Sequence, residues 1–314
     1  MSSPDLRTAE ADRTWPSLPM KEWQDTRDTL HMWSQVVGKV RMALTPAVNH
    51  WWHTTLYVSA RGLTTSLIPY GSGGFEIEFD FCRHRLIVET TSGERRTMPL
   101  EPKPVASFYA ETMAALHELG IQVEILPRPV EVETAIPFPD DHEHAAYDPD
   151  AAHRFWRLLL QGHRVLSEFR GGFAGKASPV HFFWGGFDLA VTRFSGRVAP
   201  RHPGGVPNCA DWVQEEAYSK EVSSAGYWPG AGGEGVFYAY AYPEPDGFPG
   251  FPVRPGAASY SDQFREFILP YEAVRAADDP DRTLLEFLQS TYEAAAELAG
   301  WDRAALENLR AENA

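Results

Sequence analysis

The sequence predicts an α+β protein in which an antiparallel sheet is covered by helices. Residues 75–81, FEIEFDF, alternate apolar and acidic side chains without a break, which indicates a half-exposed strand. Apolar residues recur at three- and four-residue intervals between Trp23 and Leu44, and again between Phe155 and Phe169, which indicates two long helices. The order of these patterns favours two tandem α-β-α halves with a possible pseudo-twofold duplication.

The first half is expected to span residues 15–127, after a disordered leader over residues 1–14 that lacks an apolar core. Its first helix should end before Pro46. The remaining elements expected in this half are strands over 50–58, 62–68, 75–81, 86–91 and 95–100, a helix over 104–119, and a strand over 121–125. Four prolines punctuate the next stretch, so residues 128–147 are expected to form a linker.

The second half is expected to span residues 148–314. Asp148 can cap a helix whose first turn contains Pro149, and Asp279 with Pro280 repeats the same arrangement. The elements expected from these signals are helices over 149–170, 212–219 and 280–299, strands over 180–194, 236–242 and 264–269, and a short helix from residue 302.

Composition limits the classes of partner. The chain has 314 residues, of which 43% are hydrophobic and 23% charged, as in soluble globular proteins. Its 28 basic and 43 acidic residues give a formal charge of −15, which repels phosphate backbones and anionic lipids. We therefore expect a small-molecule partner, and neither nucleic acid nor membrane. Two isolated cysteines and the lack of a signal peptide favour the cytoplasm. The oligomeric state is left open.

Residues 49–58, NHWWHTTLYV, place two histidines and two tryptophans at the start of a predicted strand. In a strand, His50 and Trp52 would share one face, and His53 and Tyr57 the other, so the two histidines could not bind one ion together. One hypothesis makes His53 a proton-transfer group beside Tyr57 and Asp188. The alternative is that these side chains only pack and form hydrogen bonds.

Residues 180–184, VHFFW, repeat the combination of a histidine and aromatic residues before a long strand. If the halves pair about an axis, His50 and His181 could meet. With Glu216 or Glu221 they would form a site of two histidines and one carboxylate for a divalent metal.

Two further features are consistent with ligand binding. Arg61 and Arg193 each lie near the end of a predicted strand and could clamp an anion, although surface salt bridges would explain them equally. The glycine-rich residues 226–235 could form a lid that carries Tyr227 and Trp228, or a plain loop. The letters GAGGEG fit a dinucleotide fingerprint, but no helix is expected to follow them, so no nucleotide cofactor is expected.

Several motifs resemble a family of uncharacterised bacterial proteins that is known only as a domain of unknown function. They are the segments at residues 15–19, 48–53, 62–65, 179–184, 216–219 and 239–243, and they include His-Trp-Trp-His and His-Phe-Phe-Trp. The resemblance extends from about Trp15 to Trp301 and implies no activity. In this family the position of Lys220 is often histidine. If that histidine is a ligand, Lys220 would weaken a metal site here.

Together these observations favour a cytoplasmic enzyme that acts on a small anionic molecule in a pocket between the halves, lined by aromatic residues and histidines. The alternative is a non-catalytic protein that binds or senses a small ligand. The expected catalytic residues are His50, His53, His181 and Asp188. The expected ligand-binding residues are Trp52, Tyr57, Arg61, Trp184, Arg193, Glu221, Tyr227 and Trp228.

Overall fold

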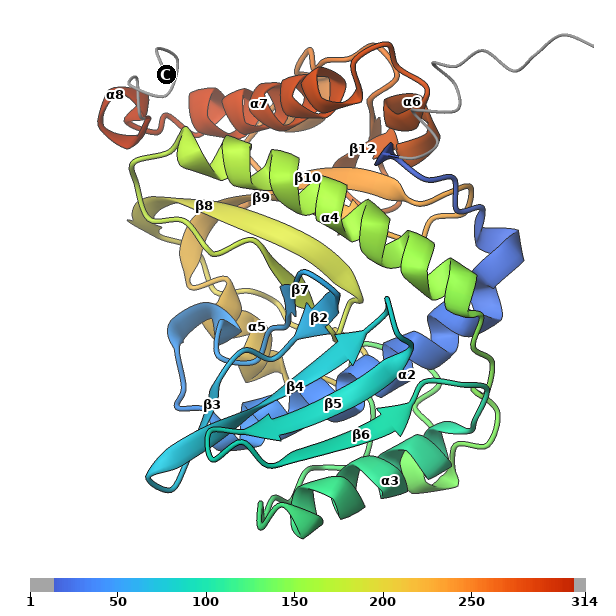
Figure 1. Ribbon diagram of the computed structural model, residues 1–314. Coiled ribbons are helices and arrows are strands. Elements are labelled where there is room, and N and C mark those ends of the chain that lie inside the picture. Colours follow the sequence, from blue (N-terminus) through green and yellow to red (C-terminus); the bar gives the residue numbers. More distant parts are fainter. Residues whose placement is uncertain (1–13, 308–314) are drawn as a thin grey trace, which may run out of the picture.

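A computed structural model describes residues 14–307, and it confirms the α+β class. The chain forms two antiparallel sheets of six strands each. Figure 1 shows the first sheet in the lower part of the molecule with α2 and α3, and the second sheet in the upper part beneath α4 and α7. Within residues 14–307, no helix combines the length and apolar character that a membrane-spanning segment requires.

The first half contains α2 (Met20–Leu44) and α3 (Val105–Glu118), with short 3-10 helices η1 (Asn49–Trp51) and η2 (Phe138–Asp140). Its strands are β1 (Tyr57–Val58), β2 (Gly62–Thr64), β3 (Ile68–Tyr70), β4 (Gly73–Asp80), β5 (Arg85–Thr90) and β6 (Arg95–Pro99). They pair in the order β1-β2-β4-β5-β6, and β3 pairs with the free part of β4.

The second half contains α4 (Pro149–Gly171), α5 (Asp211–Ala217), α6 (Tyr271–Arg275), α7 (Pro280–Leu298), α8 (Arg303–Leu306) and η3 (Phe248–Gly250). Its strands are β7 (His181–Phe183), β8 (Asp188–Val198), β9 (Lys220–Trp228), β10 (Val236–Tyr242), β11 (Ser259–Ser261) and β12 (Glu266–Pro270). The sheet order is β11-β12-β10-β9-β8-β7. The predicted caps form, since the side chains of Asp148 and Asp279 accept backbone N–H bonds at the starts of α4 and α7.

The predicted strand over residues 50–58 is wrong for most of its length. His50 and Trp51 both have φ of 59°, which is incompatible with an extended strand, and pairing begins only at Tyr57. Contacts with distant residues hold this turn: the His50 N–H donates to Glu216 Oε1 at 2.9 Å, and the Trp51 indole donates to the Val213 carbonyl at 3.0 Å. Tertiary bonds to α5 therefore override the local preference for strand.

Two other expectations also need correction. Residues 121–125 are not a strand, and the Gln122 N–H donates instead to the Tyr70 hydroxyl at 2.8 Å. The acidic face of β4 is not simply solvated, because Glu78 is 6% exposed and Asp80 is 0% exposed. Glu78 is buried in an ion pair with Arg61, and Asp80 accepts the N–H groups of residues 82 and 83.

The two sheets meet at one short antiparallel bridge. Leu56 N donates to Phe182 O at 2.9 Å, and Phe182 N donates to Leu56 O at 2.7 Å. Next to this bridge the Trp184 indole N–H donates to the Thr54 carbonyl at 2.7 Å. The first strands of the two halves therefore lie side by side. The internal duplication stays a prediction.

The beginning of the described chain packs on the opposite half. Trp15 lies against Phe237 and Tyr271, with ring centroids 6.2 and 6.1 Å apart. The Tyr271 hydroxyl donates to the Pro16 carbonyl at 2.8 Å, and Met20 N donates to Gly233 O at 2.8 Å. A single cluster of buried apolar side chains runs through both halves as a result.

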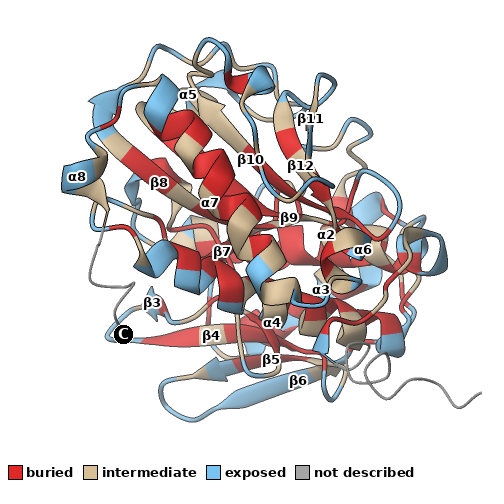
Figure 2. Cartoon of the chain, turned by 90° about the horizontal axis from the view of Figure 1, so that it is seen from above, coloured by how far each residue is buried: buried red, intermediate tan, exposed pale blue. Residues whose placement is uncertain are grey.

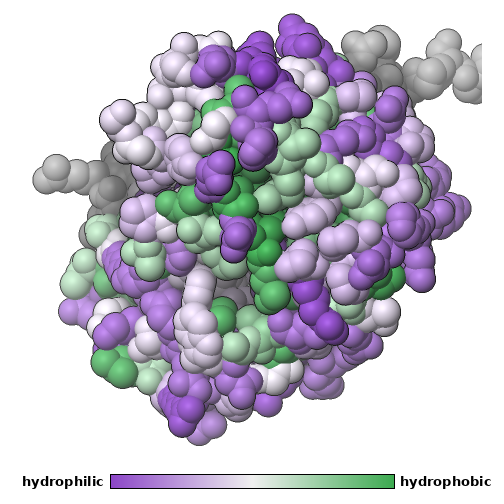
Figure 3. Space-filling model, turned by 90° about the horizontal axis from the view of Figure 1, so that it is seen from below, coloured by the Kyte–Doolittle hydropathy of each residue, from purple (hydrophilic) through white to green (hydrophobic). Residues whose placement is uncertain are grey.

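The buried residues lie mainly where the helices cover the sheets. Figure 2 shows buried residues concentrated in α4, α7 and the strands beneath them, while β6 is exposed at the edge of the first sheet. The face seen from below in Figure 3 carries charged and polar side chains around a band of apolar ones. The two residues that form the bridge between the sheets, Leu56 and Phe182, are both 0% exposed.

Gly38 permits the close approach of α2 to Trp184. A Cβ atom at this position would lie 2.2 Å from Trp184 Cδ1, whereas one at Gly162 in α4 would meet nothing closer than Leu189 Cδ2 at 3.5 Å. We predict that Gly38→Ala lowers the free energy of unfolding by about 1–3 kcal/mol because the indole must move. The matched variant Gly162→Ala should keep or raise stability, because alanine favours helix. Urea unfolding measures both, and equal stabilities would contradict the prediction.

Candidate functional site

A cavity of about 570 Å³ lies against the second sheet, a size that suits a small organic molecule. Its walls come from α2, from the loop after residue 130, from the β7–β8 turn, and from β9, β10 and β12. The lining residues are Arg27, Asp28, His31, Glu131, Val132, Glu133, Gly185, Gly186, Phe187, Asp188, Tyr218, Trp228, Tyr238, Tyr240 and Glu266.

Strand alternation directs the polar side chains of the sheet into this cavity. On β10, Phe237 lies toward α4, where its ring is the neighbour of Gly162, so Tyr238 and Tyr240 lie on the opposite face. In β12 Phe267 pairs with Ala239, which places Glu266 on the same face as the two tyrosines. α4 and α7 cover the other face. The cavity therefore occupies the side of the sheet that these helices leave open.

Asp188 is held by Tyr238 at the floor of the cavity. The Tyr238 hydroxyl donates to Asp188 Oδ2, and its ring crosses Gly226 of β9. A Cβ atom at Gly226 would lie 2.6 Å from the Tyr238 hydroxyl oxygen, so only glycine leaves room for this bond. Burial raises the pKa of Asp188 to about 6, even though the hydrogen bond from Tyr238 favours the ionised form.

Glu131 and Glu266 face the same cavity without partners. Burial, with the nearby charge of Asp188, raises the pKa of each carboxyl to about 7. Neither side chain has a hydrogen bond or an ion pair within residues 14–307. Glu131 keeps accessible surface because it borders the cavity. A Cβ atom at Gly185 would lie 2.1 Å from Glu131 Oε1, so this glycine makes space for the carboxylate.

The basic groups of the cavity do not neutralise these acids. The guanidinium of Arg27 is already paired with Asp28 at 2.5 Å. His31 donates a ring N–H to the Gly185 carbonyl at 2.8 Å, and burial lowers its pKa to about 4. His31 is therefore neutral at pH 7, and the cavity is acidic.

Aromatic groups form one wall. The rings of Tyr238 and Tyr240 stack with centroids 6.1 Å apart, and the hydroxyls of Tyr218 and Tyr240 are 2.8 Å apart. Burial raises the pKa of Tyr240 to about 12, so its hydroxyl stays neutral and can donate a hydrogen bond. With Trp228 at the end of β9, this wall offers ring surface beside hydroxyl groups.

Of the predicted site residues, Asp188 and Trp228 line this cavity. Tyr227 points away from it, since it is 1% exposed and donates to the Glu234 carbonyl at 2.9 Å. Both aromatic residues belong to strand β9. The expectation that Tyr227 and Trp228 are carried by a lid is therefore wrong, because pairing with β8 and β10 fixes them in the sheet.

The predicted metal set is not assembled. Within residues 14–307, no group of three or more His, Cys, Asp and Glu side chains is arranged to hold a metal ion. The His50 ring donates its Nδ1–H to the Ala217 carbonyl at 2.9 Å, and Glu216 accepts the backbone N–H of His50. The Trp52 ring lies beside the rings of both His50 and His181, with ring centroids 5.4 and 6.5 Å away.

His53 and His181 also lie away from the cavity. His53 Nδ1 is 3.2 Å from the Val48 carbonyl, and its ring stacks on Trp51 at 5.3 Å. His181 is 0% exposed among aromatic rings that include Tyr57, and neither ring nitrogen has a hydrogen-bond partner. Burial lowers the pKa of His181 to about 3. The geometry of both histidines is that of packed, neutral side chains.

The two predicted arginines are already engaged. Arg61 pairs with Glu78. Arg193 is 2% exposed and donates to the Phe169 carbonyl, with its guanidinium carbon 3.4 Å from the Phe169 ring centroid and 4.4 Å from that of Tyr292. The indole N–H of Trp184 donates its hydrogen bond to the Thr54 carbonyl. None of these three residues lines the acidic cavity.

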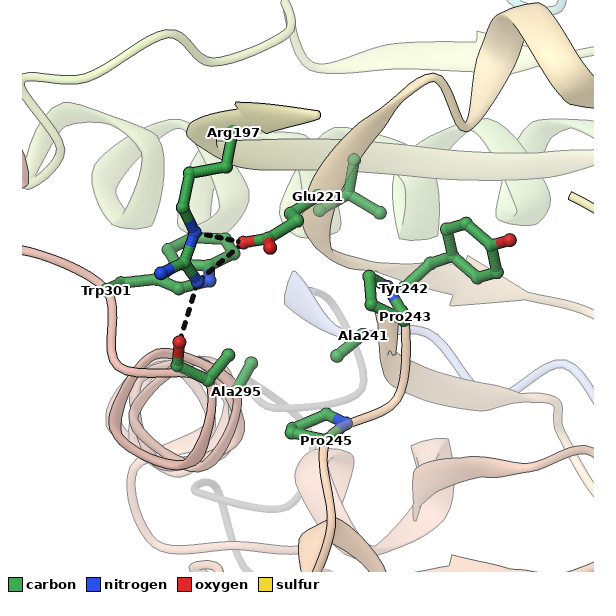
Figure 4. Close-up of a pocket in the computed structure, with 10 residues that line it drawn as sticks. Arg197, Glu221, Ala241, Tyr242, Pro243, Pro245, Ala295 and Trp301 are labelled. Carbon is green, nitrogen blue, oxygen red and sulfur yellow. Dashed lines mark hydrogen bonds and ion pairs between the residues drawn. The ribbon is translucent and has the colours of Figure 1, made fainter. Parts of the chain in front are cut away.

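Glu221 borders a second, smaller pocket of about 220 Å³ between β9, β10 and α7. Figure 4 shows Arg197 reaching across this pocket to Glu221, at 2.7 Å, and toward the end of α7, where it donates to the Ala299 carbonyl at 2.6 Å. The two charged residues of the lining are thus paired with each other. The remaining lining is largely apolar, so this pocket offers less chemistry than the acidic cavity.

The sequence patterns missed His31, Glu131, Tyr238 and Glu266. His31 looked like a flank of the apolar stripe of α2, and Glu131 lay in a segment interpreted only as a linker. One available signal was the tyrosine alternation of residues 236–242, which places two hydroxyls on one face of a strand. The other was Gly185-Gly186, which is separated from Asp188 only by Phe187, where close approach needs glycine.

The fold and the cavity define an α+β protein with an open, acidic site of small-molecule size. The model of a family of unknown function, DUF5996, matches residues 15–308, and the chain belongs to this family. No curated protein and no solved structure matches the chain.

His181 allows a test of its packing role. Because its folded pKa of about 3 lies below the unfolded value of 6.5, the unfolded chain binds a proton that the folded chain cannot, and stability falls as pH drops below 6.5. We predict that His181→Leu raises the free energy of unfolding by about 1–3 kcal/mol at pH 5 and weakens this pH dependence. Denaturant titrations at pH 5 and 7 measure it. The exposed His117→Gln is the control, and a loss of stability in His181→Leu would contradict the prediction.

Glu266 should show the opposite pH dependence. Its folded pKa of about 7 lies above the unfolded value of 4.5, so its contribution to stability is lost as pH rises from 4.5 through 7. We predict that Glu266→Gln raises the free energy of unfolding at pH 8 by about 1–2 kcal/mol, allowing for partial solvation, and has little effect near pH 4.5. Thermal or urea unfolding across pH 4.5–8 checks this. The exposed Glu124→Gln should change little at either pH.

Proposed function

We propose that the protein is a cytoplasmic enzyme that acts on a small molecule in the acidic cavity by transferring protons through carboxyl groups. The observation that carries the proposal is the convergence of Asp188, Glu131 and Glu266 on one cavity, with pKa values raised to about 6, 7 and 7. A group with a pKa near the working pH is present in both protonation states, as general acid–base catalysis requires. Such perturbed groups gather at functional sites.

Two of the carboxyls have environments that separate their roles. Asp188 accepts the Tyr238 hydroxyl, which favours its ionised form, and Glu131 has no donor within residues 14–307. A Cβ atom at Gly186 would lie 2.9 Å from Asp188 Oδ1 and 3.7 Å from Glu131 Oε2, so both acids flank the same glycine. In the proposed reaction Asp188 accepts a proton from the bound molecule and Glu131 donates one.

This proposal changes the residues that were expected to carry the chemistry. Among the histidines, His31 replaces His50, His53 and His181 as the one beside the reacting groups, and it is a neutral donor fixed by Gly185. The expected anionic substrate is replaced as well, because unpaired carboxylates repel an anion.

The proposed cellular compartment rests on the two free cysteines, and the proposed class of partner rests on the net charge of the chain. Cys82 is an exposed free thiol and Cys209 is also unpaired, which supports a reducing compartment. The formal charge of −15 supports a small-molecule partner over nucleic acid or an anionic membrane.

The test compares the wild-type chain with Asp188→Asn, which keeps an acceptor for Tyr238 but cannot take up the proton. Each protein is incubated with a small-metabolite extract, and the mixtures are followed by mass spectrometry. We predict that the wild type depletes one or a few compounds and that Asp188→Asn does so at least about 100-fold more slowly. Compounds that are bound and released unaltered by both proteins would instead establish a non-catalytic binding or sensing protein.

A further inference from the structure

We infer that the molecule recognised in the acidic cavity carries a positively charged nitrogen on a compact apolar body, such as a substituted or quaternary ammonium group. This inference rests on the site of the proposed function and names its class of ligand. It joins three observations: carboxylates without cations, an aromatic wall, and a volume far larger than a metal ion needs.

The charges that line the cavity do not balance. Arg27 neutralises Asp28 at 2.5 Å, and His31 is neutral at pH 7. Asp188, Glu131 and Glu266 then face the cavity with no positive group of the lining left to pair with them. Partial removal of these carboxylates from water without a cation costs free energy, and a bound cation offsets that cost. The missing charge has to come from the ligand, because the lining does not supply it.

The aromatic wall favours an organic ammonium ion over a metal ion. Tyr238, Tyr240 and Trp228 present ring surface beside the carboxyls, and ring faces attract ammonium groups, most strongly when these are weakly hydrated. A bare divalent ion would instead need several ligand oxygens at 2.0–2.6 Å. Within residues 14–307 no group of three acidic, histidine or cysteine side chains offers that arrangement. The cavity of about 570 Å³ leaves room for an organic body around the nitrogen.

Binding of a cation should be coupled to the loss of protons from Glu131 and Glu266. The raised pKa values of Glu131 and Glu266 mean that these carboxyls are partly protonated at neutral pH. A cation binds the ionised forms, so binding releases protons and tightens as pH rises from 6 to 8. A neutral ligand of the same shape gains nothing from this change. Charge, and not shape, should therefore decide affinity.

The experiment uses a pair of probes that differ only in charge. Choline and 3,3-dimethylbutan-1-ol have the same shape, with a quaternary nitrogen in the first and a quaternary carbon in the second. Binding to the full chain is measured by calorimetry and by melting temperature at constant ionic strength, at pH 6 and pH 8. We expect choline to raise the melting temperature and to bind at least ten times more tightly than the alcohol, with a larger preference at pH 8.

Substitutions of the carboxyl groups test whether choline binds in the acidic cavity. The double variant Glu131→Gln and Glu266→Gln should reduce the affinity for choline at least tenfold while keeping the fold, and the exposed Glu124→Gln should not. Equal responses to choline and the alcohol, no response to choline, or a choline response that survives the double variant would each overturn the inference. Calcium chloride at matched ionic strength is the further control, and tighter binding of calcium than of choline would overturn it too.

The choline experiment and the turnover experiment can fail independently of each other. Choline binding by a chain that converts no metabolite supports the ligand class and refutes the enzyme. Turnover of a neutral or anionic metabolite, together with no response to choline, refutes the ligand class and leaves the enzyme in place. Asp188→Asn, which should lose turnover, is expected to keep measurable choline binding through Glu131 and Glu266.

Discussion

The backbone bridge between Leu56 and Phe182 is the constraint on which the rest of the molecule depends. Two hydrogen bonds set the two sheets edge to edge, and Trp184, two residues later, enters the space that Gly38 leaves open on α2. The chain then turns through Gly185 and Gly186 into Asp188. The seam between the halves therefore positions the floor of the acidic cavity against α2 and the loop that carries Glu131.

The cavity concentrates groups that are unfavourable for stability. Carboxyls with raised pKa values and a neutral histidine with a lowered pKa cost folding free energy, and the packed core that runs through both halves has to offset it. Glycine makes the arrangement possible at two points. Gly226 admits the Tyr238 ring across β9, and Gly185 admits the Glu131 carboxylate. Such local cost is typical of sites that serve function.

Periodicity predicted the long helices and the strands of β4, β5 and β10, because each buries one continuous face. It failed at His50 and Trp51, where bonds to α5 impose positive φ values. The same limit applies to the site. Asp188 was named as part of a predicted strand and Trp228 as part of a glycine-rich segment, whereas the roles of Glu131 and His31 depend on a turn that is distant in sequence and lies beside them only in the fold. Side chains gathered by tertiary contact leave no periodic signal in one sequence.

The docking of Trp15 and Pro16 on Phe237 and Tyr271 has a consequence for synthesis. The segment at Trp15 finds its partners only after more than two hundred further residues have been made, because these partners lie in β10 and α6. Until then the apolar ring of Trp15 lacks the partners that cover it in the folded protein. Closure of the core at Trp15, and of the cavity wall built on α2, therefore waits until β10 and α6 have been made.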